Sequence, residues 1–78
     1  MRDETIMLTL KSVRELKGLT QEKAAALIGV SIDTLGNYER GKSYPDIPVL
    51  RSIEKVYEIP YNRLIFLPLD YDKTVNMI

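Results

Sequence analysis

Apolar residues recur along most of the chain at the spacings of short amphipathic helices, between glycines and residues that cap helix ends. The first predicted helix covers residues 9–17, where Thr9 is placed to cap the first turn and Gly18 to follow the last one. Three apolar residues are expected to form its buried stripe: Leu10, Val13 and Leu16.

Two more short helices are predicted on either side of a tight turn. Thr20 is placed to cap the segment QEKAAALI, which is rich in good helix formers, and Gly29 to end it. Ser31 follows almost at once and is placed to cap IDTLGNYER, after which Gly41 ends the helix. Two such helices joined by a turn that begins at glycine make a helix-turn-helix layout, here over about residues 20–41.

The next segment has the pattern of a fourth and a fifth helix. Asp46 is placed to cap the fourth, and Pro48 is tolerated in its first turn. The apolar face of this helix is expected to consist of Ile47, Leu50, Ile53, Val56 and Tyr57. After Pro60 we expect a short fifth helix over residues 61–66, with Leu64 and Ile65 facing inward. The predicted fold class is therefore all-α with five helices.

The C-terminal tail, residues 67–78, has a different pattern. Between positions 69 and 77 apolar residues mostly occupy the odd positions and polar residues the even ones, with Lys73 as the exception. This period of two is typical of a half-buried strand. Residues 4–10 also permit an extended conformation. Three interpretations of the tail stay open: disorder, pairing with residues 4–10, or a short β-strand that pairs with a second subunit and makes a homodimer.

Length and composition exclude several classes of function. With 78 residues, neither cysteine nor histidine, and no catalytic motif, the chain offers one modest core, no thiolate metal site and no imidazole base. We therefore expect a single domain over residues 1–78 that is not an enzyme and needs no cofactor or metal. No apolar run approaches the roughly 20 residues of a membrane span, and no signal peptide is present, so we expect a cytoplasmic protein.

The charge balance bears on nucleic-acid binding, because phosphate contacts dominate affinity in that class. The formal net charge of the chain is zero. Residues 11–51 nevertheless carry seven basic and five acidic side chains, an excess of two positive charges. The distribution is weakly biased in the direction that DNA binding requires.

The stretch LTQEKAAALIGVSIDTLGNYERGKSYPD, residues 19–46, resembles the Cro/repressor-type helix-turn-helix family, also called lambda-repressor-like or XRE-type. The resemblance extends over roughly residues 9–67. The positions that match the family's motif are Gln21, Ala25, Gly29, Leu35 and Tyr38. It implies a five-helix lambda-repressor-like DNA-binding domain, in which the third helix, about residues 32–40, enters the major groove.

The resemblance also implies residue roles. The side chains expected to face base edges are Ile32, Asp33, Thr34 and Asn37. Asn37 is the best suited of them to direct readout, because asparagine can form a bidentate pair with adenine. The residues expected to contact the DNA backbone are Thr20, Gln21, Arg40, Lys42, Ser43 and Tyr44. Arg14 and Glu39 resemble the family's internal ion pair between the first and third helices, and are expected to be structural.

Two functions fit these features. The first is a sequence-specific transcriptional regulator, similar to phage repressors and Cro, that binds a near-palindromic operator in double-stranded DNA as a homodimer. The alternative is an antirepressor or antitoxin-like module that binds a protein partner on the same fold. Zero net charge, Asp33 on the reading face and the alternating tail favour this alternative.

Overall fold

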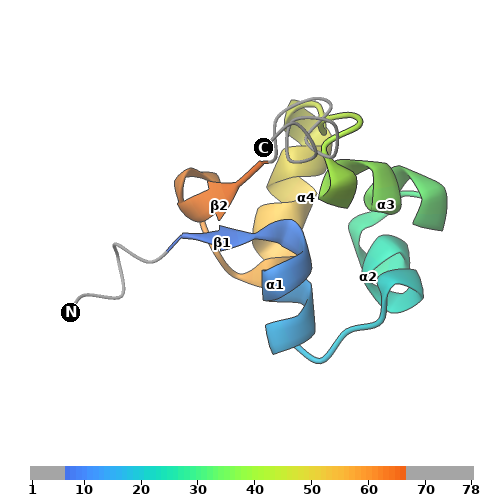
Figure 1. Ribbon diagram of the computed structural model, residues 1–78, viewed down its shortest axis with the longest axis horizontal. Helices are drawn as coiled ribbons and strands as arrows, with labels where there is room; N and C mark the ends of the chain where they lie inside the picture. The colour runs from blue at the N-terminus through green and yellow to red at the C-terminus, as the bar shows by residue number, and fades with distance from the viewer. Residues whose placement is uncertain (1–6, 67–78) are drawn as a thin grey trace, which may run out of the picture.

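A computed structural model of the chain describes residues 7–66. Its elements, in chain order, are strand β1 (Leu8–Thr9), helices α1 (Leu10–Leu16), α2 (Gln21–Ile28), α3 (Ile32–Arg40) and α4 (Ile47–Tyr57), the 3-10 helix η2 (Tyr61–Arg63) and strand β2 (Leu64–Ile65) (Figure 1). The tail over residues 67–78, with its three interpretations, lies outside the described residues.

Each α-helix begins at the capping residue that the sequence predicts. The side-chain oxygens of these residues accept a hydrogen bond from the backbone N–H three positions on: Thr9 from Ser12 (3.1 Å), Thr20 from Lys23 (3.0 Å), Ser31 from Thr34 (3.0 Å) and Asp46 from Val49 (3.1 Å). At the other end of α2, Gly29 adopts φ 98°, a left-handed conformation that is costly for residues with a side chain. Local capping chemistry therefore sets the helix boundaries.

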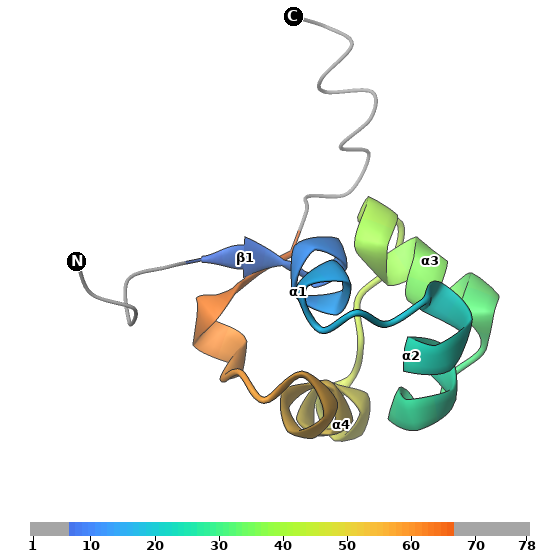
Figure 2. The ribbon, with the colours of Figure 1, turned by 90° about the horizontal axis from the view of Figure 1, so that it is seen from below.

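The helices enclose one small core. Helix α2 packs against α3 and α4, while α1 contacts α3 and β1. The helix-turn-helix pair α2–α3 lies on the side of the molecule opposite to the β1–β2 pair (Figures 1 and 2). The buried apolar residues are Leu10, Val13, Ala24, Ala25, Ile28, Leu35, Tyr38, Ile53, Tyr57 and Leu64. Ala25 of α2, one of the positions that match the family's motif, is 1% exposed, so a larger side chain there would overpack the core.

The predicted fifth helix is wrong. Residues 61–66 form the single 3-10 turn η2 and then strand β2, so the described part of the chain has four α-helices and a small strand pair. Strand β2 runs parallel to β1, with Leu8 opposite Leu64 and Thr9 opposite Ile65. Leu64 is buried as expected, whereas Ile65 is exposed. The backbone groups of this segment bond to the start of the chain rather than to a further helical turn.

Two residues assigned to buried stripes are instead exposed. Leu16 is 74% exposed and Ile47 is 67% exposed. In α1 the buried positions are Leu10, Val13 and Arg14, so an arginine occupies part of the inner face. Within residues 7–66 no helix has the length and apolar character needed to cross a bilayer.

Candidate nucleic-acid interface

Helix α3 is held by one face and exposes the other. Leu35 is fully buried and Tyr38 is 8% exposed, so these two side chains fix the helix against the core. On the outward side, Ile32 and Asp33 are exposed, while Thr34 and Asn37 are partly exposed. The four residues expected to face base edges thus lie together on the accessible part of one short, rigid helix.

The first turn of α3 has its hydroxyl groups already paired. Ser31 Oγ accepts from the Thr34 backbone N–H and donates to Thr34 Oγ1 at 2.9 Å. Because the Thr34 oxygen accepts this bond, its own hydrogen remains available for an outside acceptor. Asp33 lies in the same turn, where its negative charge complements the positive end of the helix dipole.

Arg40 folds back along the outward face of α3. Its Nη2 donates to Asn37 Oδ1 at 2.8 Å. Its guanidinium also lies over Gly36, so that a Cβ atom at position 36 would sit 3.1 Å from Arg40 Nη1. The sequence interpretation assigns Arg40 to the DNA backbone and misses this contact. The available signal is the spacing, because residues three and four apart face each other on a helix and position 36 leaves room.

The residues expected to contact phosphates lie at two places. Thr20 Oγ1 caps α2 and keeps its hydroxyl hydrogen free to donate. Lys42, just past α3, is exposed, and its backbone N–H donates to Asn37 O at 2.9 Å. Ser43 is partly exposed next to it. Tyr44 also lies on the surface, but its ring packs edge-on against Phe66, with centroids 6.5 Å apart, beside an apolar hollow.

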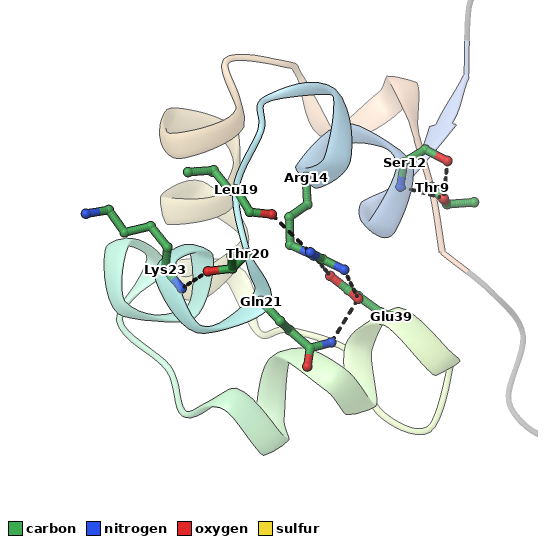
Figure 3. Close-up of polar contacts among 8 residues, drawn as sticks. All are labelled: Thr9, Ser12, Arg14, Leu19, Thr20, Gln21, Lys23 and Glu39. Atoms are coloured by element: carbon green, nitrogen blue, oxygen red, sulfur yellow. Dashed lines mark hydrogen bonds and ion pairs between the residues drawn. The ribbon is translucent and has the colours of Figure 1, made fainter.

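Arg14, Gln21 and Glu39 form a polar network where α1, α2 and α3 meet (Figure 3). Arg14 Nε lies 2.7 Å from Glu39 Oε2, and Arg14 Nη1 donates to the Leu19 carbonyl oxygen at 3.0 Å. The Arg14 side chain is 11% exposed and that of Glu39 is 5% exposed. The hydrogen bond to Glu39 raises the pKa of the Arg14 guanidinium. The network therefore has a mechanical role, since it fixes the end of α3 to α1.

Gln21 belongs to this same network. Its Nε2 donates to Glu39 Oε1 at 3.0 Å, a contact that the sequence interpretation does not foresee. Gln21 is the first residue of α2, so its backbone N–H has no partner within the helix and points out of the helix start. This position links the predicted phosphate contact directly to the ion pair that holds α3.

Charge around the site is mixed. Glu22 lies in the first turn of α2, next to the expected phosphate contacts Thr20 and Gln21, and Asp33 places a second carboxylate on the face of α3 expected to meet base edges. Lys17, which directly follows α1, pairs with Glu58 at 2.6 Å. That contact lowers the pKa of the Glu58 carboxyl group, chiefly through the hydrogen bond from Lys17. The described residues hold no cluster of three or more acidic side chains that would suggest a metal site.

Comparison with known proteins identifies the family to which this chain belongs. A family model described as "Helix-turn-helix" matches residues 10–64, which include the four α-helices of the described part of the chain. The chain is 34% identical over 55 residues to the uncharacterized HTH-type transcriptional regulator YazB of Bacillus subtilis (strain 168), covering 70% of this chain and 80% of that protein. It is also 34% identical over 56 residues to the HTH-type transcriptional activator BcrR of Enterococcus faecalis, covering 72% of this chain but 28% of that protein. The chain belongs to the XRE-type helix-turn-helix family of transcriptional regulators.

Proposed function

We propose that this protein is a sequence-specific regulator of transcription that inserts α3 into the major groove of double-stranded DNA, in the manner of Cro and phage repressors. The observation that carries the proposal is the division of α3 into two faces. Leu35 and Tyr38 are locked in the core, whereas Ile32, Asp33 and Asn37 remain accessible. A major groove about 12 Å wide admits one such helix, and its base edges meet the outward side chains.

The named relatives support a regulatory role. Both YazB and BcrR are described as transcriptional regulators, and BcrR as an activator. The similarity to each extends over at least 70% of this chain. We therefore propose that this protein also controls transcription.

Phosphate contacts are proposed around the ends of α2 and α3. Thr20 and Gln21 offer a hydroxyl group and a backbone N–H at the start of α2, where the helix dipole favours an anion. Lys42, Ser43 and Tyr44 follow the end of α3 and would contact the backbone on the other side of the helix. These contacts would set the register of α3 and carry no sequence information themselves.

A homodimer is part of the proposal. Phe66, the last described residue, lines an apolar hollow of about 420 Å³ together with Tyr44, Pro45, Leu50 and Tyr61. The chain therefore continues from an apolar surface, and the alternating pattern between residues 69 and 77 of the tail suits pairing with a second copy. Two copies of α3 would then read half-sites about 34 Å apart in a near-palindromic operator.

Selection of duplexes from a random library, followed by anisotropy titration of the enriched duplex and a scrambled one, tests the proposal. We expect a palindromic enriched sequence that is bound at least about 10³-fold more tightly than the scrambled duplex. We also expect the Asn37→Ala variant to lose much of that ratio. If no sequence is enriched and binding is weak even at low salt, the proposal fails.

The second candidate is an antirepressor or antitoxin-like protein that binds another protein through this fold. The zero net charge and the carboxylates of Glu22 and Asp33 beside the reading helix favour it. Salt distinguishes the two, because each phosphate contact steepens the fall of affinity with salt, whereas a neutral protein interface depends on salt only weakly.

A further inference from the structure

Arg40 determines which atoms of Asn37 remain available. Arginine has only hydrogen-bond donors, so the Asn37 atom facing Arg40 Nη2 at 2.8 Å is the carbonyl oxygen Oδ1. The opposite end of the amide, Nδ2, is a donor only. While this contact holds, Oδ1 keeps one lone pair beside the guanidinium, whereas both hydrogen atoms of Nδ2 stay available to a base.

Gly36 provides the room for this contact. The position lies one turn before Arg40, and the guanidinium covers it closely enough that a Cβ atom would approach Nη1 to 3.1 Å and Cζ to 3.7 Å. Glycine is among the poorest helix formers, yet it stands in the middle of α3. Its bare backbone allows the planar guanidinium to lie flat along the helix beside Asn37.

We propose that Asn37 and Arg40 act together as a pair rich in hydrogen-bond donors that reads guanine, with Arg40 positioning the Asn37 amide. This inference rests on the proposed function and specifies the base that α3 prefers. Arg40 uses one of its five N–H groups on Asn37 in the described chain and keeps the others. The Asn37 Nδ2 group and these N–H groups share one surface of α3.

The chemistry of the base edges selects guanine. In the major groove guanine presents two adjacent acceptors, N7 and O6, whereas adenine presents one acceptor and one donor. Thymine presents one acceptor and a methyl group, and cytosine presents a donor. A surface made mostly of donors matches guanine best. A bidentate pair between Asn37 and adenine would have to use the second lone pair of Oδ1, beside the positively charged guanidinium that already donates to this oxygen.

The test compares base preferences of the full chain with those of the Asn37→Ala and Arg40→Ala variants, by duplex selection and competition titration. The base pair read by Asn37 is the one whose preference disappears in Asn37→Ala. We expect guanine at that position in the wild type. Replacement of this guanine by 7-deazaguanine, which lacks the N7 acceptor, should weaken binding roughly tenfold, and this effect should shrink when both side chains are alanine.

Arg40→Ala separates positioning from simple phosphate binding. Without Arg40 both lone pairs of the Asn37 oxygen are free and the neighbouring guanidinium donors are gone, so the preference at this position should move from guanine toward adenine. Gly36→Ala, which requires the guanidinium to shift by a few tenths of an ångström, should move the preference the same way to a smaller degree. Lys55→Ala, an exposed residue of α4, serves as the control and should leave the preference unchanged.

The inference is overturned if Arg40→Ala lowers affinity for every duplex equally, or if wild-type Asn37 already prefers adenine. It is also overturned if Asn37→Ala changes no position of the enriched sequence. All three results leave the proposed function intact. A wild-type protein that enriches no duplex contradicts the proposed function itself, which keeps the two failures distinguishable.

Discussion

Arg14 of α1 and Glu39 of α3 form an ion pair, with Nε and Oε2 2.7 Å apart, and both side chains are nearly buried. The pair joins α1 to the C-terminal half of α3. Gln21 donates to the same carboxylate from the start of α2, so the Glu39 side chain links α3 to both α1 and α2. The orientation of α3 therefore depends on a polar contact as well as on apolar packing.

Removing the carboxylate should destabilise the fold. We expect Glu39→Ala to lower the free energy of unfolding by about 3 kcal/mol, because it leaves Arg14 buried without its partner. Replacing both residues with apolar ones, Arg14→Met with Glu39→Leu, should restore part of that stability. Urea denaturation followed by circular dichroism measures both. Lys17→Ala, which removes the exposed pair with Glu58, is the matched control and should have a much smaller effect. A Glu39→Ala effect no larger than the control would contradict this role.

Lys42 should contribute to affinity through charge alone. We expect Lys42→Ala to reduce the slope of log affinity against log salt by about 0.9 for each phosphate that the lysine neutralises. Affinity should fall to a similar degree for the enriched and scrambled duplexes, because a phosphate contact carries no sequence information. Anisotropy titrations at several salt concentrations give the slope, with Lys55→Ala as a control of equal charge. Equal slopes for the two variants would show that Lys42 does not meet a phosphate.

Ionisation of Tyr57 should lower the stability of the fold at alkaline pH. Burial, followed by the nearby charge of Glu39, raises the pKa of its hydroxyl group to about 12. An unfolded tyrosine ionises near pH 10, so between about pH 10 and 12 the unfolded chain loses this proton first and is favoured. The contribution of the protonated Tyr57 hydroxyl group to the free energy of unfolding is complete below pH 10 and is lost as the pH rises toward 12. We expect the wild type to lose more stability than Tyr57→Phe over this range.

The same variant tests a buried polar atom. Within the described residues Tyr57 Oη has no hydrogen-bond partner, so Tyr57→Phe should leave stability at neutral pH unchanged or raise it by up to about 1 kcal/mol. Urea denaturation at pH 7, 9 and 11.5 measures both effects. Wild-type and variant curves that stay parallel across these pH values would rule out the proposed titration.

The tail should control association. If residues 67–78 pair with a second copy, a chain truncated after Phe66 should sediment as a monomer while the full chain sediments as a dimer. It should also bind an operator containing two half-sites more weakly than the full chain, because the two contacts are no longer linked. Circular dichroism checks that the helices persist. An unchanged association state after truncation would remove the tail from the dimer interface.

The start of each helix is predictable because its cause is local. Thr9, Thr20, Ser31 and Asp46 each cap the helix that the sequence assigns to them. The end of the described chain is not predictable in the same way. Residues 64–65 become a strand because β1, more than fifty positions earlier, supplies their pairing partner, and local propensity contains no information about it.

Burial on α1 is predicted in part. Leu10 and Val13 are buried, but Leu16 lies six positions after Leu10, about one and two-thirds turns, and is turned away from that face. Arg14, four positions after Leu10, is the residue that turns inward. An arginine is seldom buried without a partner, so this placement depends on Glu39, which lies 25 positions away.

The candidate site is also only partly predictable from the sequence. The outward phase of Ile32, Asp33, Thr34 and Asn37 follows from the helical repeat once Leu35 and Tyr38 are assigned to the core. The contact between Arg40 and Asn37 depends on a choice of side-chain rotamer, which residue spacing permits but does not fix. It becomes visible only with the guanidinium placed over Gly36.

Helix α3 is the part of the protein that we expect to meet the duplex. Chemical-shift mapping of the ¹⁵N-labelled full chain, titrated with its enriched duplex, measures this directly. We expect the large shifts to concentrate on residues 20–23 and 31–44, with α4 and the β1–β2 pair little affected. Large shifts confined to the hollow around Leu50 and Tyr61, or no shifts with any duplex, would contradict the assignment of α3 as the reading helix.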